Sequence, residues 1–379
     1  MELELPLIED APFFESLVLN GAVRHAFYET EGFGSYLRAA SENSFEATTW
    51  KASVNWQPVS WLRLRGTQSH DVRAPNFAEL FLASASSFTP VTNPFVLAPL
   101  TGARTTNFPT IVSGGSPTLR PETANTTTIG LVIQPEGGML DGLRLSADAY
   151  QITVDDYIST APGGAQFLIE RCFAGVAAAC ATIDRNPAGA ITGIRNISLN
   201  LDRIRARGID FEADYRIPLQ GDTELQLRAI ATYVDELSTV SLGDKIDRAG
   251  QTGSTVGLAA PDWTVNGSAT IRTDWWAATL QGRFINSGSL DAQRIGPDDE
   301  RYKTTLANSI SDNRVDSRFY LNLFGSVFLD EGKRFELFGS VSNLLDTAPP
   351  PAPETQFYTN PVYFDTLGRY YRFGARVKL

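Results

Sequence analysis

The stretch WLRLRGTQSHDVRAPNFAELF, from Trp61 to Phe81, carries the clearest strand pattern in the chain. Leucine and arginine alternate over residues 62–65, and the polar positions continue at every second residue to Ser69. Successive side chains leave a strand on opposite faces, so one face of this segment is apolar and the other is polar. Proline cannot donate a hydrogen bond to a neighbouring strand, so the strand is expected to end before Pro75 and to lead into a long loop.

The same alternation recurs along the chain and predicts twelve strands after a short N-terminal stub. Several of these segments are longer than the six or so residues that are typical of globular proteins, and their length suits tilted strands that cross a membrane. The predicted strands are Glu2–Leu5 (the stub), Glu15–Tyr28, Phe45–Trp56, Trp61–Asp71, Thr123–Gln134, Leu143–Ile158, Arg203–Ile217, Thr223–Asp235, Trp263–Thr273, Ala277–Asn286, Arg318–Leu329, Arg334–Ser342 and Arg369–Leu379.

The connections between these strands alternate between tight turns and long loops. In an up-and-down barrel every second connection lies at the same end, so this alternation predicts an all-β, antiparallel up-and-down transmembrane β-barrel. A sandwich with crossing connections gives no reason for it. The tight connections are Gln57–Ser60, Pro135–Gly142, Pro218–Asp222, Thr273–Trp276 and Asp330–Lys333, and the long ones are Glu29–Ser44, Val72–Glu122, Ser159–Asp202, Glu236–Asp262, Ser287–Ser317 and Leu345–Gly368.

Composition excludes several classes of protein. The chain is 42% hydrophobic and 20% charged, which is ordinary for a folded domain and argues against disorder. Its net charge of −11 argues against nucleic acid as a partner. No run of 18 apolar residues predicts a membrane-spanning helix. The first residues, MELELPLIED, lack the basic start and apolar core of a signal peptide, so we interpret them as the remainder of a strand rather than a natural N-terminus.

Motifs of catalysis and of metal binding are absent from the sequence. It contains no P-loop, HExxH or GxSxG pattern and only two histidines, so we expect neither an enzyme, nor a metal site, nor a cofactor. The acidic run of residues 298–300 is interpreted as a solvated loop. Cys172 and Cys180 lie close together in CFAGVAAAC and could either form a disulfide or remain two free thiols.

Several motifs of the chain resemble those of the TonB-dependent outer-membrane receptors. The first is similar to the R-x-P-x-x-x-E-L-F segment of that family, and SVSNLLDTAPP is similar to its N-L-F-D strand end, with leucine in place of phenylalanine. A third motif resembles G-x-D-x-E-x-x-Y, and the terminal RYYRFGARVKL resembles the closing strand of outer-membrane barrels. The motif residues are Arg73, Pro75, Glu79, Leu80 and Phe81 in the first, Asn343 and Asp346 in the second, and Gly208, Asp210, Glu212 and Tyr215 in the third.

The resemblance implies a fold, a location and partners. Residues 1–379 would be the C-terminal part of a receptor barrel, with about 12 of about 22 strands and without the plug domain that fills such barrels. The protein would lie in the outer membrane of a Gram-negative bacterium, surrounded by its lipid, and contact the TonB complex through the missing plug. It would import a siderophore, cobalamin or an oligosaccharide, and the expected ligand-contacting loops run from Phe81 to Leu119 and from Phe357 to Tyr363.

Two other classes of protein remain open at this stage. A soluble extracellular β-protein that binds carbohydrate or cleaves glycans could use the long loops to build a groove. A passive porin would share the barrel and would conduct ions without a plug.

Overall fold

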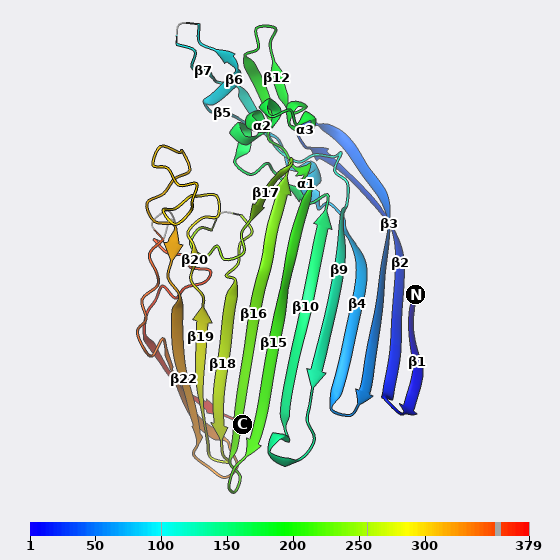
Figure 1. Cartoon of the computed structure of the whole chain (residues 1–379), viewed down its shortest axis with the longest axis vertical. Helices are drawn as coiled ribbons and strands as arrows, with labels where there is room; N and C mark the ends of the chain where they lie inside the picture. Colours follow the sequence, from blue (N-terminus) through cyan, green and yellow to red (C-terminus); the bar gives the residue numbers. More distant parts are fainter. Residues whose placement is uncertain (100, 256, 353–357, 379) are drawn as a thin grey trace.

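A computed structural model of the protein describes residues 1–99, 101–255, 257–352 and 358–378. One antiparallel sheet of 14 strands dominates it, and strands that follow one another in this sheet also follow one another in the chain (Figure 1). The path runs through β1 (Glu2–Ala11), β2 (Phe14–Gly34), β3 (Ala39–Val59), β4 (Leu62–Arg73), β9 (Glu122–Ile133), β10 (Leu143–Asp155), β15 (Arg203–Pro218), β16 (Glu224–Ser241), β18 (Trp263–Arg272), β19 (Trp276–Ile285), β22 (Arg318–Phe328), β23 (Phe335–Ser342) and β24 (Tyr370–Val377), and β17 (Asp244–Asp247) pairs with β16.

The predicted up-and-down arrangement is confirmed. Short turns join the strands at one end of the sheet, and at the other end long loops join all of them except β2 and β3, as Figure 1 shows. In the described part of the chain β1 and β24 form the two edges of the sheet, which therefore is not closed and corresponds to part of a barrel. No helix among the described residues is long and apolar enough to cross a membrane.

The strands mostly present apolar side chains to one face of the sheet and polar ones to the other, with Ile230, Tyr320 and Phe324 as exceptions on the polar face. One cross-strand row places Leu227, Ala269, Leu280 and Leu323 side by side. The next row, on the opposite face, is polar throughout and consists of Arg228, Ser268, Gln281 and Asn322. A charged group facing lipid at the membrane midplane costs roughly 2–4 kcal/mol, so the apolar face is the outer one and the polar face lines the lumen.

The apolar outer face has a clear upper limit. Tyr233 and Trp263 lie there with ring centroids 4.9 Å apart, and Phe211 stacks on Trp263 at 6.2 Å. Just above, the outward positions of β15 become arginines, which form ion pairs with carboxylates of the neighbouring strands. On β19 the apolar positions run from Trp276 to Phe284, which is about 26 Å of strand at 3.3 Å per residue and matches a hydrocarbon layer.

The structure corrects three boundaries of the sequence prediction. The strand predicted to end at Asp235 continues as β16 to Ser241, six residues into the predicted loop Glu236–Asp262. The segment Glu29–Ser44 is not a long loop, because β2 and β3 remain paired as far as Gly34 and Ala39 and only a four-residue turn joins them. The N-terminal stub does not end at Leu5, because β1 continues to Ala11 across a bulge. The extended β2–β3 hairpin lies above the apolar band, where glutamates take outward positions and the alternation that marks a membrane strand is lost.

The long loops carry their own secondary structure. The loop after β4 contains α1 (Phe77–Phe81), β5 (Ala85–Phe88), β6 (Val91–Leu97), β7 (Arg104–Asn107) and β8 (Thr110–Ser113). The loop after β10 contains β11 (Ile158–Ser159), α2 (Gly164–Phe173), α3 (Ala177–Cys180), β12 (Ile183–Arg185), β13 (Ile191–Arg195) and β14 (Leu199–Asn200). The remaining short elements are η1 (Gly138–Leu140), β20 (Gly288–Ser289) and β21 (Arg314–Val315).

Candidate functional site

Residues 74–99, 101–121 and 159–202 form one folded unit above the sheet, which we call the crown (Figure 1). A four-stranded sheet with the order β12-β13-β8-β5 joins the two loops, and β8 and β13 pair in parallel. Strand pairing between loops so far apart in sequence fixes their relative position. The crown is therefore a rigid candidate for ligand capture rather than a set of independent loops.

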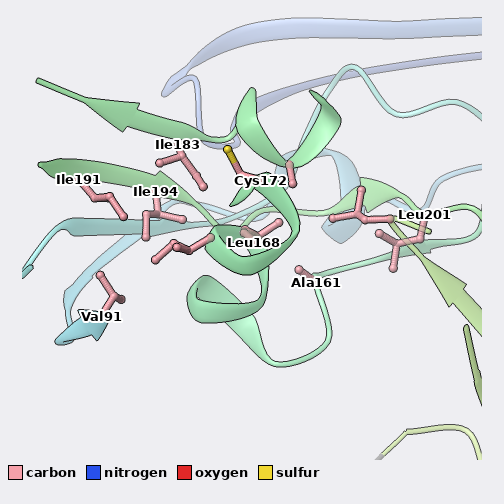
Figure 2. Close-up of a cluster of buried hydrophobic side chains, with 11 residues drawn as sticks. Val91, Ala161, Leu168, Cys172, Ile183, Ile191, Ile194 and Leu201 are labelled. Carbon is pink, nitrogen blue, oxygen red and sulfur yellow. The ribbon is translucent and has the colours of Figure 1, made fainter. Parts of the chain in front are cut away.

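An apolar core holds the crown together. Leu168 and Ile169 of α2 are fully buried, and Ile191 and Ile194 of β13 pack against them, as does Val91 of β6 (Figure 2). Burying a side chain of this size contributes about 1.5–3 kcal/mol, so five of them supply a stable core. The core explains why these long loops keep a fixed shape.

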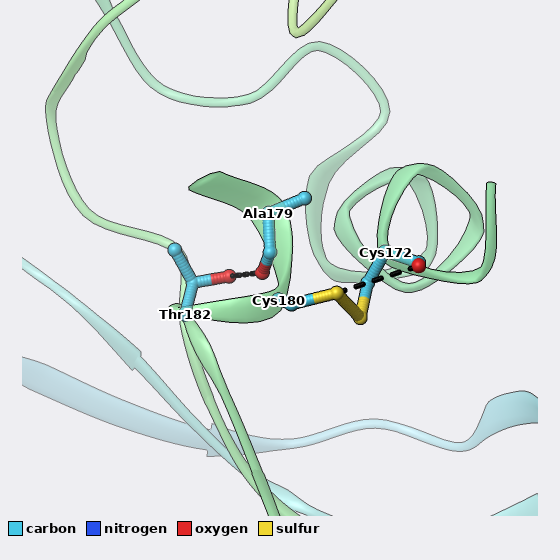
Figure 3. The surroundings of a disulfide bond; sticks show 4 residues. All are labelled: Cys172, Ala179, Cys180 and Thr182. Carbon is cyan, nitrogen blue, oxygen red and sulfur yellow. Dashed lines mark hydrogen bonds between the residues drawn. A yellow bond between two sulfur atoms is a disulfide. The ribbon is translucent and has the colours of Figure 1, made fainter. Parts of the chain in front are cut away.

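A disulfide between Cys172 and Cys180 joins α2 to α3 at the edge of this core (Figure 3). Beside it the hydroxyl of Thr182 donates to the carbonyl of Ala179 at 2.7 Å. This hydrogen bond satisfies a carbonyl group at the C-terminal end of α3. The bond fixes the last turn of α2, and with it the position of the following residue, Phe173. The disulfide is thus placed to hold the exposed Phe173 side chain in a fixed position on the crown.

Reduction of this disulfide is expected to loosen α2 and α3 without unfolding the main sheet. Closing a loop of this length stabilises by about 2 kcal/mol, so amide exchange in residues 164–180 should accelerate about 30-fold on reduction. Hydrogen exchange read by mass spectrometry checks this. The variant with both Cys172→Ser and Cys180→Ser should show the fast rate with or without reductant, and a rate that stays slow in that variant would contradict the role.

The Arg73 motif fixes the point where the crown leaves β4. The guanidinium donates to both carboxylate oxygens of Glu122, at 2.7 and 2.5 Å, and to both of Glu79, at 3.1 and 3.0 Å. Glu79 in turn accepts from the backbone amide of Asn76, whose side chain accepts from the Glu79 amide and so caps α1. The amide of Ile158 donates to Glu122 at 2.7 Å and ties in the second loop. We call this group the Arg73 clamp.

Glu122 lies above the apolar band, at the start of β9, and it is nearly buried. Burial alone would raise the pKa of its carboxyl group. Hydrogen bonds from Arg73 and from the Ile158 amide outweigh burial, so the pKa of Glu122 lies below its ordinary value. Leu80 and Phe81 complete the clamp by packing with Leu119 and Ile158. The motif therefore has a structural role, and its side chains are occupied by one another rather than free for a ligand.

Phe81 also holds the tip of the β2–β3 hairpin against the crown. A Cβ atom on Gly32 would lie 2.5 Å from the Phe81 ring, so only glycine allows this approach. The backbone amide of Ser35 donates to the Phe81 carbonyl, and the amide of Tyr36 donates to the carbonyl of Gly115 at 3.0 Å. The predicted loop from Phe81 to Leu119 is thus braced from below by the clamp and from the side by the hairpin.

The second motif closes the loop that follows β23. The Asn343 side chain is buried, donates to the carbonyl of Thr347 and to the carboxylate of Asp365, each at 3.0 Å, and accepts from the Thr347 amide at 2.8 Å. Asp346 accepts from the amide of Arg369 at 3.0 Å, where the chain enters β24. The two motif residues therefore join the start of this loop to its end.

Replacement of Asn343 by alanine is expected to release this loop. Three hydrogen bonds are lost and the partly buried carboxylate of Asp365 loses a donor, which costs about 1–3 kcal/mol. Asn343 also has φ of 49°, a conformation that glycine adopts without strain, so Asn343→Gly isolates the hydrogen-bond loss. Exchange of the amides of residues 365–369 measures the effect. Rates equal to wild type in both variants would contradict the closing role.

The second predicted ligand segment, from Phe357 to Tyr363, lies at a different place. Phe357 is outside the described residues. Tyr363 donates its hydroxyl to the carbonyl of Ala259 at 2.7 Å, and its ring packs beside Phe364 over Tyr320 on the lumen face of β22. Tyr358 is exposed. The two predicted segments therefore pack into separate clusters, and a role of either in ligand contact stays a prediction.

The structure brings together four residues that sequence reasoning did not single out. Phe95 and Phe173 meet with ring centroids 5.5 Å apart, Arg104 lies over Phe173 and Arg185 lies over Phe95. Two of them come from each loop of the crown, so no local sequence pattern could have indicated the group. Within the described residues, no cluster of three or more His, Cys, Asp or Glu side chains is placed to hold a metal ion.

Comparison with known proteins identifies the fold. A family model described as the TonB-dependent receptor-like β-barrel matches residues 7–344. A mutant of the ferric enterobactin receptor PfeA from Pseudomonas aeruginosa aligns with a TM-score of 0.55 and 13% identity over 95% of this chain and 45% of that one. The siderophore receptor PirA from Acinetobacter baumannii aligns with a TM-score of 0.57 and 15% identity over 99% of this chain and 53% of that one. The FrpB iron transporter from Neisseria meningitidis aligns with a TM-score of 0.55 and 12% identity over 99% of this chain and 44% of that one.

This chain spans about half the length of those structures, and at such identities the likeness concerns the fold alone. No protein of curated function matches the sequence significantly. The family model nevertheless covers most of the chain and includes the Arg73 clamp and Asn343. The family consists of receptors and transporters of the outer membrane, not enzymes. The chain therefore belongs to the TonB-dependent receptor β-barrel family.

Proposed function

We propose that residues 1–379 form the C-terminal part of the barrel wall of an outer-membrane uptake receptor that captures a scarce small ligand. The observation that carries this proposal is the combination of a polar lumen face with a rigid crown above it. The crown offers a fixed surface for ligand capture, and the lumen offers a hydrated path. Of the ligands that the sequence leaves open, a metal chelate is favoured over cobalamin or an oligosaccharide, since the similar structures include a siderophore receptor and an iron transporter.

The remaining parts of the proposal concern location and energy. The apolar outer face supports insertion into the outer membrane of a Gram-negative bacterium, with its lipid as the surrounding partner. A plug domain, contributed by a part of the receptor outside this chain, would fill the lumen and contact the TonB complex. Energy from the inner membrane would then move the plug so that the captured ligand passes.

The experiment is deletion of the gene in the bacterium that encodes it, followed by uptake of radiolabelled ferric chelates, cobalamin and oligosaccharides. We expect loss of uptake for one ferric chelate, restored by the gene and abolished by a protonophore. Unchanged uptake of all three ligand classes would overturn the proposed function. Uptake that is lost on deletion but insensitive to the protonophore would instead favour a passive porin.

The soluble alternative fits the observations less well. Rows such as Leu227, Leu280 and Leu323 cover the outer face with apolar side chains that have no partner in water. A soluble carbohydrate-binding protein would place these rows against a second sheet. A cheap check is extraction, because a membrane barrel should remain in the outer-membrane fraction after a high-salt wash and require detergent for release.

A further inference from the structure

The outer face of the main sheet has a groove at the upper limit of its apolar band. Ile129, Ala149, Ile209 and Tyr233 lie in one cross-strand row and therefore share this face. Ala149 has the smallest side chain of the row, and the groove over it has a volume of about 520 Å³. Arg207 lies at its upper end. We call this groove the wall groove.

A second hollow lies on the other side of Ile129. Gly66 of β4 is the next residue in the same row, and its missing side chain leaves a space of about 410 Å³ that Ala52 and Thr127 border. Ile129 is 66% exposed and separates the two hollows as a ridge. Both hollows open toward the lipid side of the sheet, where extended acyl chains would pack.

Three arginines continue the outer face of β15 above the wall groove. Arg203, Arg205 and Arg207 occupy every second position, which spreads them over about 13 Å at 3.3 Å per residue. We call them the arginine ladder. Each forms an ion pair with a carboxylate of a neighbouring strand, and these carboxylates are Asp155, Glu236 and Asp235 in the same order.

In each of these ion pairs the guanidinium is the more exposed partner. The side chains of Arg203, Arg205 and Arg207 are 54%, 37% and 47% exposed, against 34%, 8% and 38% for their carboxylates. A guanidinium has five N–H donors, and the contacts among the described residues use at most two of them in each arginine. The arginine ladder therefore offers donors to an anionic group at the membrane surface.

The basic surface is confined to one part of the wall. Above the apolar band the outward positions of the β2–β3 hairpin hold Glu29, Glu31, Glu42 and Glu46 instead. An anionic headgroup is attracted to β15 and repelled by the hairpin, so its contact with the wall is local rather than general.

We infer that the wall groove and the arginine ladder together bind a phosphorylated, multiply acylated glycolipid of the outer leaflet. The acyl chains lie in the two hollows beside Ile129, and phosphate oxygens accept from the guanidiniums. One phosphate cannot span the three arginines, which favours a headgroup with several acidic groups over a phospholipid with one. The inference rests on the proposed function only for the membrane location, since the crown side must face the outer leaflet.

The test is native mass spectrometry of the full-length receptor in detergent, titrated with bisphosphorylated lipid A. Dephosphorylated lipid A keeps the acyl chains and lacks the charge, and phosphatidylglycerol has a single phosphate. We expect lipid A to bind at least 10-fold more tightly than either comparator. The variant with both Arg205→Gln and Arg207→Gln should weaken its binding about 10-fold. Ala149→Phe fills the wall groove, keeps every ion pair and should weaken binding several-fold.

Matched controls separate this site from general surface effects. Arg301→Gln with Arg314→Gln removes two exposed, ion-paired guanidiniums from a loop, and Ala278→Phe adds a ring to the outer face of β19. Both should bind lipid A like the wild type. Unchanged binding in the arginine variant or in Ala149→Phe would overturn the inference, and so would phosphatidylglycerol binding as tight as that of lipid A.

The proposed function fails separately from this inference. A receptor that binds lipid A through these residues yet supports no uptake retains the glycolipid site and loses the transport role. A receptor that supports uptake but does not prefer lipid A to its dephosphorylated form keeps the transport role and loses the glycolipid site.

Discussion

Leu280→Arg is expected to destabilise the barrel by about 2–4 kcal/mol. Leu280 lies at the middle of the apolar stretch of β19, on the outer face, between Ala269 and Leu323 of the adjacent strands. A guanidinium at that depth would face hydrocarbon and is too far from either membrane surface to reach water easily. The measurement is the free energy of unfolding in lipid vesicles, obtained from urea titration of tryptophan fluorescence.

The adjacent residue provides the matched control. Gln281 is one position along the same strand, on the lumen face, where its side chain oxygen accepts from Asn322 at 3.4 Å. Gln281→Arg adds the same group to the hydrated side, so its effect should stay within about 0.5 kcal/mol. Equal destabilisation by the two variants would contradict the assignment of the outer and lumen faces.

The two faces could be predicted from sequence because lipid and water impose a period of two on every strand between them. The row through Leu280 and the row through Gln281 follow directly from that period. Above the membrane this constraint ends. The β2–β3 hairpin continues through Glu31 and Glu42, which lie opposite each other on one face, and nothing in their local pattern marks a strand. Its tip packs against Phe81, a contact that is distant in sequence.

The crown shows the same limit more strongly. The spacing of Cys172 and Cys180 allowed a disulfide but could not choose it over two thiols. The parallel pairing of Ile111 with Ile194 joins residues from different loops and has no local signature. Resemblance to known receptors pointed to Arg73, but the motif does not include Glu122, so the physical role of the arginine became visible only when the two were found in contact.

Arg73→Ala is expected to release the base of the crown, at a cost of about 2–4 kcal/mol. Breaking a fully buried ion pair costs about 3–5 kcal/mol, and the effect here is smaller because the Arg73 side chain is about half exposed. The loss still exceeds that of a surface pair, because Glu122 remains buried with its charge facing an unfilled space. Arg120→Ala is the control: it removes the exposed pair with Asp156 nearby and should cost at most about 1 kcal/mol.

The pH dependence distinguishes this clamp from simple packing. In the wild type the pKa of Glu122 is lowered on folding, so its contribution is complete above its unfolded pKa of about 4.3 and is lost as the pH falls through the folded value. Without Arg73, burial becomes the dominant influence and raises that pKa, so the variant crown should gain stability as the pH falls from 7 toward 4. Amide exchange in residues 76–82, corrected for the intrinsic pH effect, measures both slopes. A variant that keeps the wild-type slope would show that Arg73 does not hold the Glu122 charge, and that packing of Leu80 and Phe81 against Leu119 and Ile158 holds the base of the crown instead.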